Sequence, residues 1–485
     1  MKNIIHNSIR TLTSIALIML IPIISIISSC SDDFLRYPPE LNMPEENAFE
    51  NPERIARQVV GLYASAKAGQ LFGGRYYIYS DIRGEEFENR TANTVTGFTT
   101  YMFTNTPNDT YIAGFWRFGY LTINRVNKFL EDLGANPDVI PAEVETRYRA
   151  EAKFLRALCY HGLIQLFARP YTLDNGASRG IPLRLQAETS SANNDLAPSS
   201  VAEIYAQILS DLEEAEAGLA TDNGSANENT TRAHKNTAVA LKTRVLLHMG
   251  RYEDVIAEGN KIVSAEAPFT SPNNVAHTLQ GNVVNVFRTY NTLESVLSFP
   301  MADTNAPGLQ NQLGYYYNQG NIEYFLNQSA PGIYANTVAW PATDARRTGL
   351  TTVNTPILHL LTKWSGVSPF IDWVPVIRYA EVLLNVAEAE AEAGNLARSI
   401  ALLQAVRSRS DATYTFTGLN NPANVVQAIL LERRIELLGE GFRIPDLQRR
   451  NDPINSVGAG IAIPITDSRY VFPIPTTESL TNNDI

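Results

Sequence analysis

The sequence has very little cysteine, which excludes a fold held together by a framework of disulfide bonds. Only Cys30 and Cys159 occur among the 485 residues, so they could form one bridge at most. Cys159 falls on an apolar helical face with Leu155, Leu163 and Leu166. This pattern favours a buried, apolar role for the Cys159 thiol over a reactive one.

The sequence also lacks the patterns that mark most catalytic and metal sites. None of its six histidines stands at metal-ligand spacing from another with a third ligand nearby, so no zinc site is predicted. These are His6, His161, His234, His248, His277 and His359. No GxSxG motif, phosphate-binding loop or dinucleotide fingerprint is present. The sequence therefore predicts a protein that is not an enzyme and that uses neither cofactor nor metal.

Positive charge is scarce, which argues against nucleic acid as a partner. The chain has 39 basic and 50 acidic residues, for a net charge of −11. Without residues 1–29, which hold Lys2 and Arg10 and no acid, 37 basic residues face the same 50 acids and the net charge is −13. A polyanion would be repelled by such a chain.

The N-terminal stretch has the pattern of a lipoprotein signal peptide. Residues 1–29 carry Lys2 and Arg10, followed by an uncharged apolar run from Thr11 that ends at Ser29, directly before Cys30. The small residues before Cys30 favour cleavage and lipidation there, with residues 30–50 as a lipidated tether. The alternative is an uncleaved membrane anchor, because the run approaches the roughly 20 residues that span a bilayer.

The clearest helical pattern lies between Arg378 and Arg450. Its first part repeats apolar residues along one helical face until Gly394, and two further helices follow, the second opening at Asn421. A fourth helix is expected near Pro445. Helical pattern recurs near residues 52–69, 110–133, 141–168, 198–220, 233–249, 251–264, 371–393, 395–409 and 422–450.

Two of these helix pairs look like repeats of one another. Each places a glycine, Gly250 or Gly394, at a hairpin turn, with small residues before it and an apolar-periodic helix after it. This is a degenerate tetratricopeptide-like pattern. The sequence predicts a mainly α fold, in which such repeats form a right-handed frame and an irregular, loop-rich lobe with short strands carries the ligand site. Residues 51–485 are expected to form one layered unit with a first part to about 265, an irregular insertion to about 370, and a C-terminal helical part.

Several motifs together resemble the SusD/RagB family of nutrient-binding outer-membrane lipoproteins. The C-terminal ones are RYAEVLLNVAEAEAEAGN, LLQAVRSR, ERRIELLGEGFRIPDLQRR and VFPIPTTESLTNN, and AEAKFLRALCYHGLIQLFARPY resembles the family's long N-terminal helix. The chain departs from the family at Ile444-Pro445, where an aromatic residue is frequent, and at Ala168-Arg169, where Gly-Asp is usual. The resemblance implies a lid over a SusC-type TonB-dependent barrel, with the acidic run after Cys30 as a signal for export to the cell surface.

The resemblance also implies the function, which is to capture an oligosaccharide and pass it to that barrel. Peptides remain an alternative ligand, because some members of the family resemble peptide collectors. Two further alternatives are a tetratricopeptide-type scaffold that grips another protein and a lipid-anchored glycosidase.

Two clusters of charged residues are candidate chemical sites. Glu432, Glu436 and Glu440 recur one helical turn apart, as paired carboxylates for glycoside hydrolysis could. Interleaved arginines, Arg433, Arg434 and Arg443 among them, should lower the carboxyl pKa values and favour structural ion pairs. A second cluster, Asp81, Glu85, Glu86 and Glu88, could hold calcium, although its spacing fits no calcium motif and a solvated acidic turn is the alternative.

Aromatic residues gather in two polar segments without helical period, residues 72–105 and 310–345. Tyrosine rings can stack on the flat faces of sugars while neighbouring polar groups bind hydroxyls. The predicted ligand-binding residues are Tyr76, Tyr77, Asp81, Arg83, Tyr315, Tyr316, Tyr317, Asn318 and Trp340, with Asn321 as a further polar contact. The alternative for each ring is a place in the core.

Overall fold

The computed structural model describes residues 47–318, 322–364 and 368–485. The predicted signal peptide, Cys30, most of the tether and Asn321 lie outside these ranges. The chain divides into two units, residues 1–55 and 56–485. Helix α2 (Pro52–Ala66) begins in the first unit and continues into the second, and the Asn51 side chain accepts a hydrogen bond from the Arg54 amide at its start.

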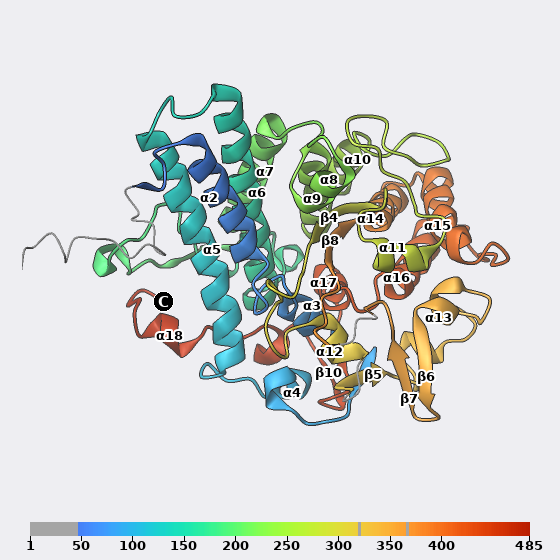
Figure 1. Ribbon diagram of the computed structural model, residues 1–485. Coiled ribbons are helices and arrows are strands. Elements are labelled where there is room, and N and C mark those ends of the chain that lie inside the picture. Colours follow the sequence, from blue (N-terminus) through green and yellow to red (C-terminus); the bar gives the residue numbers. More distant parts are fainter. Residues whose placement is uncertain (1–46, 319–321, 365–367) are drawn as a thin grey trace, which may run out of the picture. The chain divides into compact units, whose positions relative to one another are not determined.

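The second unit is built on a series of helices in which each packs on the next. In order they are α5 (Thr110–Ala135), α6 (Ala142–Phe167), α7 (Val201–Gly218), α9 (Lys235–His248), α10 (Tyr252–Gly259), α14 (Tyr379–Glu392), α15 (Leu396–Ser410) and α16 (Pro422–Glu436). The series can be followed from α5 to α15 in Figure 1. This arrangement confirms the predicted mainly α, tetratricopeptide-like fold.

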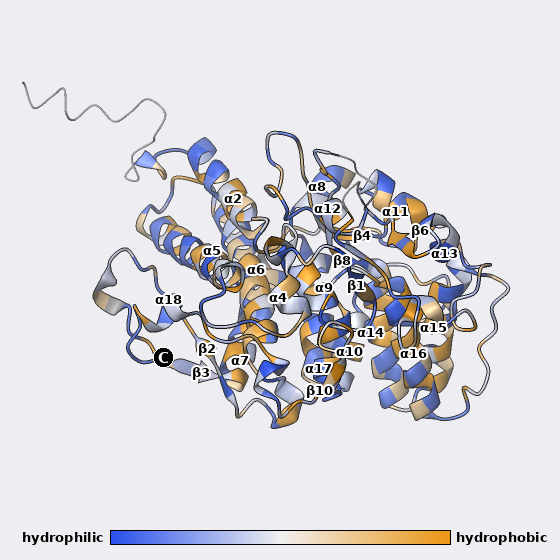
Figure 2. Cartoon of the chain, turned by 90° about the horizontal axis from the view of Figure 1, so that it is seen from below, coloured by the Kyte–Doolittle hydropathy of each residue, from blue (hydrophilic) through white to orange (hydrophobic). Residues whose placement is uncertain are grey.

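Two glycines close the hairpins of this series, as predicted. Gly250 separates α9 from α10 and Gly394 separates α14 from α15, with φ values of +69° and +88°. L-amino acids with a Cβ rarely adopt this left-handed conformation, so glycine ends the first helix at low cost. Figure 2 shows hydrophilic and hydrophobic residues alternating along α5 and α15, as expected for helices with one covered face.

The structure corrects one of the predicted helix boundaries. The helix expected from residue 371 starts only at Tyr379, because β8 (Val374–Arg378) pairs in antiparallel register with β4 (Ser295–Phe299). There a tertiary contact overrides a local helical pattern. The two helices expected after Asn421 and near Pro445 are confirmed: α16 ends before a turn containing Gly439 and Gly441, both with positive φ, and α17 (Arg443–Arg449) follows.

The irregular segments contain short elements that the periodicity did not predict. Between α2 and α5 lie α3 (Arg75–Asp81), β1 (Phe87–Asn89), η2 (Thr94–Thr96) and α4 (Phe98–Tyr101). Beyond α10 come α11 (Val283–Thr289), α12 (Leu313–Tyr317), β5 (Tyr324–Leu326), η5 (Ile333–Ala335), α13 (Ala345–Gly349), β6 (Thr351–Thr355) and β7 (Leu358–Leu361). All seven residues of α3 are buried, so it has no polar face and therefore no amphipathic signal.

The remaining elements are also short. They are η3 (Tyr171–Leu173), β2 (Arg179–Pro182), η4 (Ser191–Asn193), β3 (Pro198–Ser200), α8 (Ala226–Thr231), β9 (Ile454–Ser456), β10 (Ile461–Ile463), η6 (Ser468–Tyr470) and α18 (Thr476–Ser479). Strands β9 and β10 form an antiparallel hairpin, as β6 and β7 do. Within the described ranges, no helix combines the length and the apolar character needed to span a bilayer.

Several polar residues with an apolar helical context lie in the core. Cys159 is buried and free, and burial raises the pKa of its thiol, which confirms the predicted inert role. His161 and His248 lie on α6 and α9 with their ring nitrogens 3.1 Å apart. Burial lowers the pKa of His161 to about 3 and that of His248 well below its usual value.

We expect these histidines to make the fold sensitive to mild acid. His234 is another, with a pKa lowered to about 3 by burial and by the neighbouring His277. The folded state keeps His234 neutral while the unfolded chain binds a proton below about pH 6.5, so the free energy of unfolding should fall as the pH drops through this range. Each such histidine lowers the free energy of unfolding by up to about 1.4 kcal/mol for each pH unit below this value.

The measurement is the midpoint of thermal unfolding between pH 7.5 and pH 5. The midpoint should fall for the natural chain, and it should fall less steeply for His234→Leu, which has one titrating group fewer. A midpoint that does not change over this range would show that these imidazoles take up protons in the folded state.

Candidate functional site

Most of the rings predicted to bind ligand are buried. Tyr76, Tyr77, Tyr316, Tyr317 and Trp340 all belong to the core. Tyr317, for example, packs with its ring centre 4.6 Å from that of Phe87. A ring with no accessible face cannot stack on a sugar, so in this structure these five rings do not form the predicted ligand surface.

The remaining predicted residues divide between core and surface. Asp81 is buried and accepts a hydrogen bond from the Gly441 amide at 2.8 Å, and Arg83 is also buried. Tyr315 and Asn318 are half-buried, and the Asn318 side chain donates to the Trp364 carbonyl at 3.2 Å. Of the nine predicted residues, only Tyr315 and Asn318 keep appreciable exposure.

The glutamates of α16 and the turn after it form buried ion pairs. Glu436 lies 2.7–2.9 Å from guanidinium nitrogens of Arg346, Arg378 and Arg409. Burial alone would raise the pKa of Glu436, but Arg409, Arg378 and Arg346 lower it well below its usual range. Arg378 and Lys363 likewise lower the pKa of Glu440, although its burial alone would raise it. These carboxylates are held ionised, which suits structural ion pairs and not a general acid.

The acidic cluster after α3 is neither solvated nor arranged for a cation. Glu85 and Glu86 are buried, and they pair with Arg443 and Arg434 of α17 and α16. The Glu86 side chain also accepts from the Ile333 amide at 2.7 Å. The expected solvated turn is therefore wrong for Glu85 and Glu86, because arginines from the C-terminal part cover them, whereas Glu88 is only half-buried. In the described part of the chain no three His, Cys, Asp or Glu residues gather as metal ligands.

The two irregular segments nevertheless meet, through a pair of strands. Strand β1 lies antiparallel to β5, with Phe87 opposite Leu326, Glu88 opposite Phe325 and Asn89 opposite Tyr324. Side chains alternate between the two faces of such a ribbon. Phe87, Tyr324 and Leu326 are fully buried on one face, whereas Glu88 and Phe325 are half-buried on the other.

Glu88 and Phe325 form the outer face of this ribbon. Directly opposed residues of antiparallel strands bring their Cβ atoms to about 5 Å from each other. The Glu88 carboxylate, which can accept hydrogen bonds from sugar hydroxyls, therefore lies beside the Phe325 ring, which can pack on the C–H face of a sugar. Among the described residues, the Glu88 carboxylate forms no ion pair and no hydrogen bond.

A cavity of about 480 Å³ opens next to this face. Its lining comes from Glu88, from the loop after β5 and from the β9–β10 hairpin: Asn327, Ser329, Ala330, Pro331, Asn455, Ser456, Val457, Gly460, Ile461 and Ala462. Ile461 is 50% exposed there, while Asn455 offers an exposed amide. We call Glu88, Phe325 and this cavity the ribbon site.

The ribbon site is held in place from behind. The buried Asn327 side chain donates to the Glu85 carbonyl at 2.8 Å and accepts from the Ser329 amide at 2.8 Å. Arg434 joins Glu86 to the Pro331 carbonyl, which it contacts at 2.7 Å. Such fixed loops lower the entropy that is lost when a ligand binds.

Signals for the ribbon site are weak in the sequence. Glu88 belongs to an acidic cluster whose pattern suggests a calcium site or a solvated turn, and Phe325 is one ring among many in its segment. The alternation of Tyr324, Phe325 and Leu326 between buried and half-buried places is typical of a strand, but three residues are too short for a reliable period. The β9–β10 hairpin was missed altogether, although glycines mark its turn.

The fold is that of a helical-repeat protein with an irregular lobe that holds an open cavity. Residues 371–462 match the model of the SusD family, and residues 33–247 match a family described as starch-binding and associating with the outer membrane. A SusD superfamily protein from Bacteroides fragilis is 34% identical over 90% of this chain and 99% of its own, with a TM-score of 0.82. The chain therefore belongs to the SusD family.

Two other relatives are more distant. The SusD-like protein P25 of Formosa agariphila is 24% identical, over 87% of each chain. A laminarin-binding SusD-like protein shares 21% identity over 89% of this chain and 98% of its own, with a TM-score of 0.69. At this level of identity the second comparison shows a common fold.

Proposed function

We propose that the protein is a cell-surface lipoprotein that binds an oligosaccharide at the ribbon site and delivers it to a TonB-dependent barrel in the outer membrane. The observation that carries the proposal is the pairing of β1 with β5, which sets Phe325 opposite Glu88, and Glu88 lines an open cavity. Family membership supports a carbohydrate ligand, as do the starch-binding description and the laminarin-binding relative.

The chemistry of the ribbon site suits a neutral sugar chain. Phe325 supplies a ring face, Ile461 an apolar wall, and Glu88 and Asn455 polar groups that bind hydroxyls. The site is open, so a long chain could extend beyond it. Peptides are the alternative ligand, since an extended peptide could also lie in such a cavity.

Delivery to a barrel has its own test. The resemblance to the SusD/RagB family implies a separate TonB-dependent barrel, so we expect the two proteins to form a complex. Gentle detergent extraction of the tagged protein, expressed with its neighbouring genes, should recover a much larger β-barrel. Recovery of the free chain alone under these conditions would contradict delivery, while leaving carbohydrate binding untouched.

Lipidation at Cys30 is part of the same proposal. Cys30→Ala removes the only sulfur to which the lipid could attach in this segment, so the protein should move from the membrane fraction to the soluble fraction. Cys159→Ala is the control and should remain in the membrane. A Cys30→Ala protein that stayed membrane-bound and unprocessed would indicate an uncleaved anchor.

A further inference from the structure

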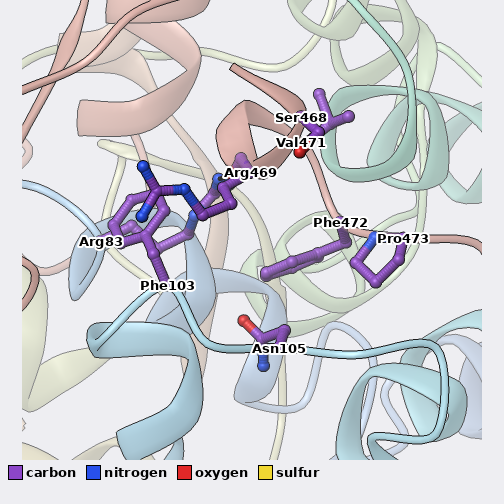
Figure 3. A pocket seen from close by; sticks show the side chains of 8 residues that line it. All are labelled: Arg83, Phe103, Asn105, Ser468, Arg469, Val471, Phe472 and Pro473. Atoms are coloured by element: carbon purple, nitrogen blue, oxygen red, sulfur yellow. Dashed lines mark hydrogen bonds between the residues drawn. The ribbon is translucent and has the colours of Figure 1, made fainter.

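A second, smaller cavity lies beside Arg83, formed by the α4–α5 loop and the C-terminal segment (Figure 3). Its volume is about 130 Å³. The lining residues are Arg83, Phe103, Asn105, Ser468, Arg469, Val471, Phe472 and Pro473. Neither Glu88 nor any residue of the β9–β10 hairpin takes part, so this cavity is separate from the ribbon site.

Arg83 is fixed in one orientation at this cavity. It is only 1% exposed, and its Nη2 donates to the carbonyls of Arg469 and Tyr470 at 2.8 and 2.9 Å. Its guanidinium carbon lies 4.8 Å from the ring centres of both Phe103 and Phe472. Phe103 has a φ of +55°, a strained conformation for an aromatic residue that recurs at binding sites.

The positive charge of Arg83 is not neutralised by any described carboxylate. Arg346 and Arg378, which are buried as deeply, each lie against several carboxylates, whereas Arg83 has no ion pair among the described residues. Its Nη1 also finds no hydrogen-bond acceptor there. Burial lowers the pKa of Arg83 to about 10, so it remains charged at neutral pH. An unpaired buried cation is unfavourable, which makes an anion the natural occupant.

The opposite wall of the cavity offers a hydrogen-bond acceptor. The Asn105 amide nitrogen donates to Asp109 at 2.9 Å and to Thr99 at 3.2 Å, which fixes the orientation of the amide. Its oxygen therefore points away from these partners, and Figure 3 shows that oxygen on the side of Phe472. Arg469, also in the lining, is paired with Asp467 at 2.7 Å and adds little net charge.

We propose that this cavity binds the carboxylate of a hydroxy acid. The carboxylate would accept a hydrogen bond from the Arg83 guanidinium, and a neighbouring hydroxyl would donate to the Asn105 oxygen. Two sources share this chemistry, a uronic acid residue of a glycan and a small free hydroxy acid. The inference goes beyond the proposed function, because a neutral oligosaccharide at the ribbon site needs no buried cation.

The test is calorimetric titration of the purified full chain with galacturonate, lactate, galactose and inorganic phosphate. Galacturonate or lactate should bind saturably, and galactose should not bind at this cavity. Binding of galacturonate alone identifies a sugar acid, and equal binding of lactate identifies free hydroxy acids. The proposal is overturned if no carboxylate binds at concentrations up to about 10 mM, or if phosphate binds as well as galacturonate.

Matched variants locate the binding. Ser468 is exposed and its side chain forms no hydrogen bond within the described ranges, so Ser468→Trp can block the cavity without disturbing Arg83. We expect at least a tenfold loss of affinity in Ser468→Trp and in Arg83→Met, and none in Ser468→Ala. Arg83→Met also loses two structural hydrogen bonds, so Ser468→Trp is the decisive variant. Unchanged affinity in Ser468→Trp would overturn the assignment.

Discussion

Glu436→Ala should unfold most of the protein under conditions in which the natural chain is stable. The carboxylate of Glu436 is fully buried among Arg346, Arg378 and Arg409. Removing it leaves three guanidinium groups close together with less compensating charge. Breaking a buried ionic network in this way costs about 3–5 kcal/mol, a large part of the roughly 5–15 kcal/mol that stabilises a typical protein.

Urea unfolding followed by circular dichroism measures the effect. Glu145→Ala is the matched control, because Glu145 pairs with Arg149 at 2.7 Å on a more exposed surface of α6. Exposed pairs of this kind contribute about 0.2–1 kcal/mol, so its unfolding midpoint should change little. A Glu436→Ala protein with the natural midpoint and lost ligand binding would mean that Glu436 acts in binding and not in the frame.

The double substitution Glu88→Gln with Phe325→Ala should abolish most oligosaccharide binding at unchanged stability. Both side chains are half-buried on the outer face of the β1–β5 ribbon, so neither is a core residue. A hydrogen bond to a charged group contributes about 1.5–3 kcal/mol, and the ring adds stacking. Since about 1.4 kcal/mol corresponds to a tenfold change in affinity, the combined loss should exceed tenfold.

Calorimetric titration and thermal unfolding of the same samples separate binding from stability. Val353→Ala is the control, because Val353 is exposed on β6 and lies outside the ribbon site. It should leave both affinity and melting temperature unchanged. If the double variant bound oligosaccharide as well as the natural chain does, the binding surface would have to lie elsewhere on the protein.

The helical frame could be predicted because its signals are local. In α14, for example, small and apolar residues repeat along the helix until Gly394, and the structure ends α14 at the turn that Gly394 closes. Where a local helical pattern predicted the wrong element, hydrogen bonds to a strand far away in the sequence were the reason. Residues 374–378 form a strand because β4 supplies the hydrogen bonds.

The binding residues could not be predicted because burial in an irregular lobe has no period. Tyr316 and Tyr317 stand in a polar sequence that suggests exposure, yet both are fully buried, packing against Tyr324 and Phe87. Within β5, the long-range pairing with β1 decides that Tyr324 turns inward while Phe325 faces outward. That register cannot be read from three-residue strands.

The sequence also does not show that Arg83 has no ion pair. Arg83 stands two residues before Glu85, so the sequence is compatible with an ion pair between them. In the structure Arg443 takes Glu85, while Arg83 turns to the carbonyls of the C-terminal segment. Competition between arginines for a carboxylate depends on tertiary geometry.

A binding screen shows whether this protein binds carbohydrate. The purified full chain should be applied to an array that holds neutral glucans, including laminarin, acidic glycans and peptides. We expect saturable binding to at least one class of neutral oligosaccharide, and we expect the Glu88→Gln, Phe325→Ala variant to lose it. Binding to peptides alone, or equal glycan binding by the natural chain and the variant, would contradict it.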